Sequence, residues 1–119
     1  MALPSYESYM LKTRRATAAT CLLEISQFME RFFTKNLQYD KDANGNDIVM
    51  PSAATQECQS ALSGYYDFAS TVAPRTYSLR AVPINGQTRD TLCATLSIDE
   101  TLRKSASGTA SSDPSACWK

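Results

Sequence analysis

The sequence predicts an α+β fold in which one long amino-terminal helix lies across a face of an antiparallel sheet of three or four strands. Two patterns support this class. Apolar residues recur at steps of three and four within residues 5–35, and polar and apolar residues alternate over much of residues 64–104. The chain has 119 residues, and 43% of them are apolar, so it can form one modest core. We therefore expect a single domain over residues 1–119.

The second half of the long helix is amphipathic. Five apolar residues share one helical face, namely Ala18, Leu22, Ile25, Met29 and Phe32. The opposite face carries polar residues, namely Thr13, Thr17, Thr20, Glu24, Gln27 and Arg31. We expect the apolar face to cover the sheet.

The beginning of the helix does not continue this pattern. Extending the apolar stripe toward the start gives Leu11, but Arg14 and Arg15 then fall on the stripe. We therefore expect residues 6–15 to project away from their own domain and to contact another molecule. A solvated, frayed helix end is the alternative.

A loop follows over residues 36–63, with a short helix near residues 56–62. Its segment DKDANGND resembles the start of a calcium-binding loop in the spacing of four residues, namely Asp40, Asp42, Asn44 and Gly45. The twelfth position, where such a loop needs a bidentate glutamate, is Pro51. Asn, Asp and Gly also gather in ordinary surface turns, so we expect a turn that does not bind calcium specifically.

Three segments that alternate with a period of two make up the predicted sheet over residues 64–104. The first is YYDFAST. The second is TYSLRAVPI, with one side formed by Tyr77, Leu79 and Ala81, and the third is TLCATLSID, with one side formed by Leu92, Ala94, Leu96 and Ile98. The dipeptide Asn85-Gly86 between the last two segments is a turn signal, which predicts an antiparallel hairpin or meander.

The chain contains no histidine and four cysteines. The lack of histidine excludes Ser-His-Asp and Cys-His catalytic sites and the commonest metal ligand. Cys21, Cys58, Cys93 and Cys117 are far apart, which favours two disulfides in an oxidising compartment over a metal or redox motif. Buried reduced thiols are the alternative, and three pairings are open. Cys93 lies on the face of its predicted strand opposite the leucines, where the tail over residues 105–119 could bring Cys117.

Charge and hydropathy exclude further classes of protein. Twelve basic residues balance twelve acidic ones, so no charge excess points to nucleic acid. No apolar run approaches the roughly 20 residues that span a bilayer. No paired acid and base and no activated nucleophile stands out, so we expect neither an enzyme nor a bound cofactor or metal.

Three motifs in order resemble a known family. ALPSYESYMLKTRRA is similar to the segment of type IV pilins that leads from the hydrophobic half of the first helix into the globular head. MERFFTKN resembles the motif at the end of that helix, and AVPINGQTRDTLCATLSID with the terminal CW resembles PilE-type minor pilins of Gram-negative bacteria. The resemblance covers nearly the whole chain apart from the loop after Asn36, although Ala94 stands where the family usually has glycine.

The resemblance implies a type IV pilin-like roll whose carboxy-terminal loop is held by a disulfide. Together with the outward face of Cys93, it predicts the pair Cys93–Cys117, and the remaining cysteines then give Cys21–Cys58. It also implies that an apolar helix half of about 20 residues precedes this segment in the full-length protein, with Met1 as an added initiator.

The resemblance further implies an assembly subunit, a minor pilin that helps to prime type IV pilus assembly and enters the fibre near its tip. Its expected partners are other minor pilins, the major pilin and the inner-membrane assembly machinery. It would face the periplasm from the inner membrane before assembly and then lie in the extracellular fibre. The expected subunit contacts are Tyr6, Tyr9, Met10, Lys12, Arg14 and Arg15.

Two other functions stay open. A pilin that binds DNA during uptake needs a basic stripe with aromatic residues. Such a stripe is disfavoured because five basic residues of the head are scattered among acids, namely Arg75, Arg80, Arg89, Arg103 and Lys104. The other alternative is a secreted calcium or small-ligand binder built on DKDANGND.

Overall fold

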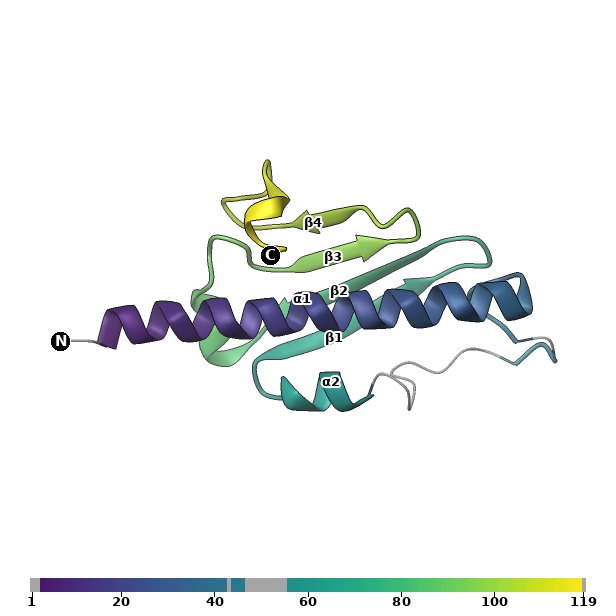
Figure 1. Ribbon diagram of the computed structural model, residues 1–119, viewed down its shortest axis with the longest axis horizontal. Helices are drawn as coiled ribbons and strands as arrows, with labels where there is room; N and C mark the ends of the chain where they lie inside the picture. Colours follow the sequence, from purple (N-terminus) through teal and green to yellow (C-terminus); the bar gives the residue numbers. More distant parts are fainter. Residues whose placement is uncertain (1–2, 43, 47–55, 119) are drawn as a thin grey trace.

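The computed structural model describes residues 3–42, 44–46 and 56–118 and confirms the predicted α+β class (Figure 1). The long helix α1 spans Leu3–Asn36, and the short helix α2 spans Gln56–Ala61. Four strands follow, β1 (Tyr66–Val72), β2 (Tyr77–Pro83), β3 (Leu96–Asp99) and β4 (Lys104–Ala106). They form one antiparallel sheet in the order β1-β2-β3-β4, and α1 lies across one face of it (Figure 1).

The core lies between α1 and the sheet. Four residues of the predicted apolar face of α1 are buried, namely Ala18, Leu22, Ile25 and Met29, whereas Phe32 is only partly buried. All six residues of the predicted polar face are exposed. Across the interface, Leu79 pairs with Ile98 and Ala81 with Leu96 in the β2–β3 register, and all four side chains are buried. The period-two pattern of the sheet is thus confirmed on its inner face.

The predicted strand over TLCATLSID is wrong in its first half. β3 begins only at Leu96, because Ala94 has a left-handed backbone (φ 52°) that ends any extended run before it. Leu92 consequently points away from the core and is 45% exposed. The connection from β2 contains the 3-10 helix η1 (Asn85–Arg89) in place of a tight two-residue turn.

Both predicted disulfide pairs are present. Cys21–Cys58 joins α1 to α2, and Cys93–Cys117 joins the turn before β3 to the carboxy-terminal segment. Cys93 is fully buried in that turn, so the reason given for its pairing, an outward position on a strand, is wrong although the pair is right. The sequence separations of 37 and 24 residues give each bridge a stabilisation of about 3 to 4 kcal/mol in the chain-entropy description.

The carboxy-terminal segment packs directly on the turn that carries Cys93. The backbone N–H groups of Gly108 and Thr109 donate to the carbonyl oxygens of Cys93 (3.1 Å) and Thr91 (3.0 Å). A Cβ atom at Gly108 would overlap the carbonyl oxygens of Thr91 and Leu92, so the close approach requires glycine.

The DKDANGND segment forms a turn around one aspartate in its described part. Asp42 Oδ1 accepts hydrogen bonds from the backbone N–H groups of Asn44 (2.9 Å) and Asn46 (3.0 Å), and these bonds lower the pKa of Asp42 below its usual value. Gly45 takes a left-handed backbone (φ 83°). Pro51 lies outside the described residues, and the absence of specific calcium binding stays a prediction.

Candidate functional site

The first turns of α1 present exposed aromatic and basic side chains. Tyr6 and Tyr9 are 61% and 65% exposed, Lys12 is exposed, and Met10 is partly buried. Large exposed aromatic side chains on a helix of a folded domain are typical of surfaces that bind another molecule. The structure therefore agrees with an outward position for Tyr6, Tyr9 and Lys12, and the role of all four residues as subunit contacts stays a prediction.

One turn further along, α1 is fastened to its own domain by an ion pair. Arg15 Nη1 lies 3.0 Å from Asp90 Oδ1, and the two side chains are only 11% and 3% exposed. The backbone N–H of Cys93 donates to the same carboxylate oxygen at 3.4 Å. The pair thus links α1 to the turn that also holds the Cys93–Cys117 disulfide.

Gln87, which is fully buried in η1, extends this connection. Its Nε2 donates to the carbonyl oxygen of Leu11 at 3.0 Å and to the hydroxyl oxygen of Tyr66 at 3.1 Å. Burial raises the pKa of Tyr66 to about 12. One amide group therefore joins α1, η1 and the first residue of β1.

Two further contacts join the first half of α1 to the rest of the domain. Arg89 forms an ion pair with Glu7, and the guanidinium carbon of Arg14 stands 3.9 Å from the ring centroid of Tyr65. Both contacts belong to the surface, where an ion pair contributes about 0 to 1 kcal/mol and a cation–π contact about 0.5 to 1 kcal/mol.

The expectation that residues 6–15 all project away from their own domain is wrong for Arg14 and Arg15. Arg15 pairs with Asp90 from the β2–β3 connection, and Arg14 stands over the ring of Tyr65, which directly precedes β1. Sequence reasoning treated NGQTRD as a turn only and missed Gln87 and Asp90. Two arginines on an otherwise apolar stripe call for an acidic partner, and this was the available signal.

A second polar cluster, also missed from the sequence, joins the end of α1 to the sheet. Glu30 Oε1 accepts hydrogen bonds from the hydroxyl groups of Tyr39 (3.2 Å) and Tyr77 (3.3 Å). Burial, reinforced by the nearby carboxylate, raises the pKa of both tyrosines. The cluster holds the segment after α1 against β2.

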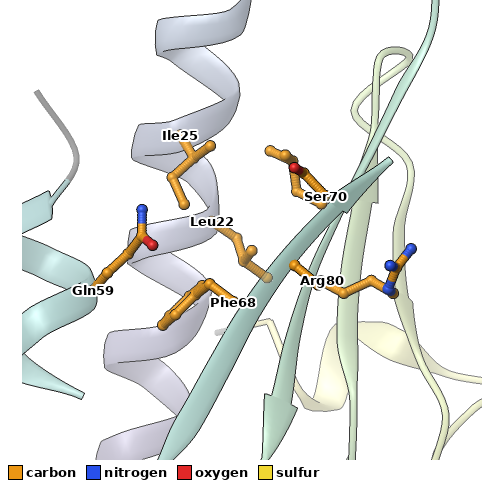
Figure 2. Close-up of a pocket in the computed structure, with 8 residues that line it drawn as sticks. Leu22, Ile25, Gln59, Phe68, Ser70 and Arg80 are labelled. Atoms are coloured by element: carbon orange, nitrogen blue, oxygen red, sulfur yellow. The ribbon is translucent and has the colours of Figure 1, made fainter. Parts of the chain in front are cut away.

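A hollow of about 300 Å³ lies between α1, α2 and the β1–β2 pair. In Figure 2, Leu22 and Ile25 come from α1, Phe68 and Ser70 from β1, and Gln59 from α2, while the guanidinium of Arg80 points away. Among the residues that the structure describes, the lining contains one base, Arg80, and no acid. Among the described residues, no group of three or more Cys, Asp or Glu side chains is placed to hold a metal ion.

Within the part of the chain that the structure describes, no helix is both long enough and apolar enough to cross a bilayer.

Comparisons with known proteins agree with this architecture. Residues 4–97 match the family described as type IV minor pilin ComP, DNA uptake sequence receptor. A type IV pilin from Shewanella oneidensis is 25% identical, with a TM-score of 0.62, and the match covers 92% of this chain and 98% of that one. The non-core minor pilin PilV of Neisseria meningitidis shares the fold at 23% identity, with a TM-score of 0.57 and coverage of 85% and 90%. No curated protein matches the sequence.

The family match spans most of the chain, and the two solved pilins share its fold at TM-scores of 0.62 and 0.57. The pilin family and fold are structural and non-enzymatic. The chain belongs to the type IV minor pilin family of ComP.

Proposed function

We propose that this chain is the periplasmic head of a minor pilin that helps to prime type IV pilus assembly and then enters the fibre near its tip. Before assembly, the full-length protein is held in the inner membrane by an apolar helix half. Its partners are other minor pilins, the major pilin and the assembly machinery of the inner membrane. The head carries out no reaction, and its role is to pack against its neighbours.

The observation that carries this proposal is the exposure of Tyr6 and Tyr9 on a helix that is otherwise fixed to the head. The polar cluster around Arg15, Asp90 and Gln87 holds α1 rigidly just after these tyrosines. A rigid helix that presents two aromatic side chains can bind without first ordering a flexible segment, which removes an entropic cost from subunit packing. Lys12, exposed on the same part of α1, adds a positive charge for an acidic neighbour.

The test is the double variant Tyr6→Asp and Tyr9→Asp in the full-length protein. We expect the head to unfold at an unchanged temperature, because both side chains are already exposed, while the amount of the protein in sheared pili falls strongly. The matched control is Thr20→Asp, another exposed position of α1, one that lies away from the tyrosines. Normal incorporation of the double variant would contradict the contact role of the tyrosines.

DNA binding is the second candidate, and the family match favours it more than the sequence alone did. The matched family is described as a DNA uptake sequence receptor. In addition, three exposed basic residues lie at one end of the molecule, namely Lys35 at the end of α1, Arg75 between β1 and β2, and Arg103 between β3 and β4 (Figure 1). The hydrogen bond from the backbone N–H of Tyr39 to the carbonyl oxygen of Pro74 (2.9 Å) brings the first two segments together.

A fluorescence-anisotropy titration of the head with double-stranded DNA at several salt concentrations tests this candidate. Binding through these cations predicts an affinity that falls steeply with salt, and a smaller salt dependence for Lys35→Glu with Arg75→Glu. Arg89→Glu, at the opposite end of the molecule, is the control. No binding at about 50 mM salt would rule the candidate out for the isolated head.

A further inference from the structure

A groove of about 350 Å³ lies between α1 and the turn that joins β3 to β4. Its lining residues are Leu23, Ser26, Gln27, Glu30, Arg31 and Leu102. Leu23 and Leu102 give the groove apolar walls, and Leu102 is 54% exposed.

Leu102 has an unusual backbone for a leucine. Its φ of 63° is left-handed, a conformation in which glycine or asparagine carries little steric cost and a leucine is strained. The turn imposes this conformation, because Asp99 Oδ1 accepts from the backbone N–H groups of Thr101 (2.9 Å) and Arg103 (3.1 Å). A residue that is both strained and largely exposed contributes little to the stability of the head, so its apolar surface is available for another molecule.

The described lining of the groove carries one acid, Glu30, and one base, Arg31. Glu30 Oε1 is engaged by the hydroxyl groups of Tyr39 and Tyr77. Arg31 is exposed and makes no ion pair within residues 3–42, 44–46 and 56–118. The groove therefore offers an unpaired guanidinium beside apolar walls, which suits an aromatic or apolar side chain with a carboxylate next to it.

The first turns of α1 present that combination on the same molecule. Tyr6 and Tyr9 are exposed, and the side chain of Glu7 between them is 44% exposed in its surface pair with Arg89. Tyr9 precedes Gln27 by 18 residues, which is five turns of about 3.6 residues, so both side chains leave the same side of α1 about 27 Å apart.

We propose that the groove between α1 and the β3–β4 turn binds the first turns of the helix of an adjacent pilin subunit, with a tyrosine side chain between Leu23 and Leu102 and a carboxylate near Arg31. The inference rests on the proposed incorporation into a fibre and names the surface that makes the contact. The two surfaces are different and are displaced along the helix axis, so the contact joins neighbouring subunits head to tail and does not close a symmetric dimer.

The first experiment places the photo-crosslinker p-benzoylphenylalanine at Gln27 of the full-length protein in assembled pili. We expect adducts with the first turns of the helix of the neighbouring pilin subunit, at or next to its tyrosine. The same probe at Thr20, which is exposed on α1 outside the groove, should give far fewer such adducts. Adducts from Gln27 to the sheet of a neighbour or to DNA, or equal yields from the two probes, would overturn the inference.

The second experiment compares Leu102→Gly with Leu37→Gly. Both leucines have a left-handed backbone (φ 63° and 62°) and are largely exposed, but only Leu102 lines the groove. Both variants should keep or raise the melting temperature, because glycine relieves the strain. We expect Leu102→Gly alone to lower the yield of the Gln27 adduct several-fold.

Equal yields for the two glycine variants would contradict the docking of a side chain against Leu102. The outcomes also separate this inference from the proposed function. Absence of the unsubstituted protein from sheared pili would contradict incorporation itself, whereas incorporation without the Gln27 adduct would contradict only the groove.

Discussion

Arg15→Met tests whether the polar docking of α1 on the β2–β3 connection stabilises the head. In the native structure the Arg15 side chain, 11% exposed, lies 3.0 Å from that of Asp90, 3% exposed. Methionine keeps a long unbranched side chain in the helix. It removes the ionic partner of the Asp90 carboxylate, which still accepts a hydrogen bond from the backbone N–H of Cys93 at 3.4 Å. Removing one partner of a buried ion pair costs about 3 to 5 kcal/mol, and we expect the lower end because Arg15 retains some solvent contact.

The assay is equilibrium unfolding in urea with both disulfides oxidised, which gives the free energy of unfolding from the midpoint and slope. Arg89→Met is the matched control, because its pair with Glu7 is exposed (68% and 44%) and its loss should cost no more than about 1 kcal/mol. The double variant Arg15→Met with Asp90→Leu should recover much of the lost stability, since it leaves no buried unpaired charge. Equal losses for Arg15→Met and Arg89→Met would refute the reasoning.

Three further predictions follow from single features of the head. Gly108→Ala should lower the free energy of unfolding by about 1 to 3 kcal/mol in the same assay, because its Cβ overlaps the carbonyl oxygens of Thr91 and Leu92; an unchanged midpoint would contradict the close approach. The raised pKa of Tyr66, about 12 in the folded state against 10.0, means that the folded state holds a proton that the unfolded state releases. The contribution of this tyrosine to the free energy of unfolding is therefore complete below pH 10 and is lost as the pH rises toward 12. Tyr66→Phe should flatten the fall of the unfolding free energy at alkaline pH, and an unaltered slope against pH would argue against the burial of Tyr66. Low-millimolar calcium should leave the melting temperature unchanged, and a shift that Asp42→Ala abolishes would show a specific site.

The helix and the inner face of the sheet were predictable because their patterns are local. Ala18, Leu22, Ile25 and Met29 repeat at the helical period, and burial against a flat sheet selects one such face. The start of β3 was not predictable in the same way. Alternation continues through Leu92 and Ala94 in the sequence, but the left-handed backbone of Ala94 is imposed by the turn and has no signature in an alanine.

The docking of the first half of α1 depends on distant residues. Arg15 donates a hydrogen bond to Asp90, which lies 75 residues later in the sequence. The carbonyl oxygen of Leu11 accepts a hydrogen bond from Gln87, which lies 76 residues later. A periodic pattern identifies which side chains need a partner, but it does not identify a partner that another segment brings. The same limit applies to Tyr6 and Tyr9, whose role as subunit contacts stays a prediction.

Quantitative mass spectrometry of sheared, purified pili tests the proposal that this chain is the head of a minor pilin that enters the pilus. A soluble periplasmic protein measured in the same samples corrects for contamination. We predict that the full-length protein co-purifies with the fibre at a small fraction of the major pilin, and that deleting it reduces the number of pili and pilus-dependent motility. Its absence from the fibre, together with unchanged piliation and motility after deletion, would contradict the account.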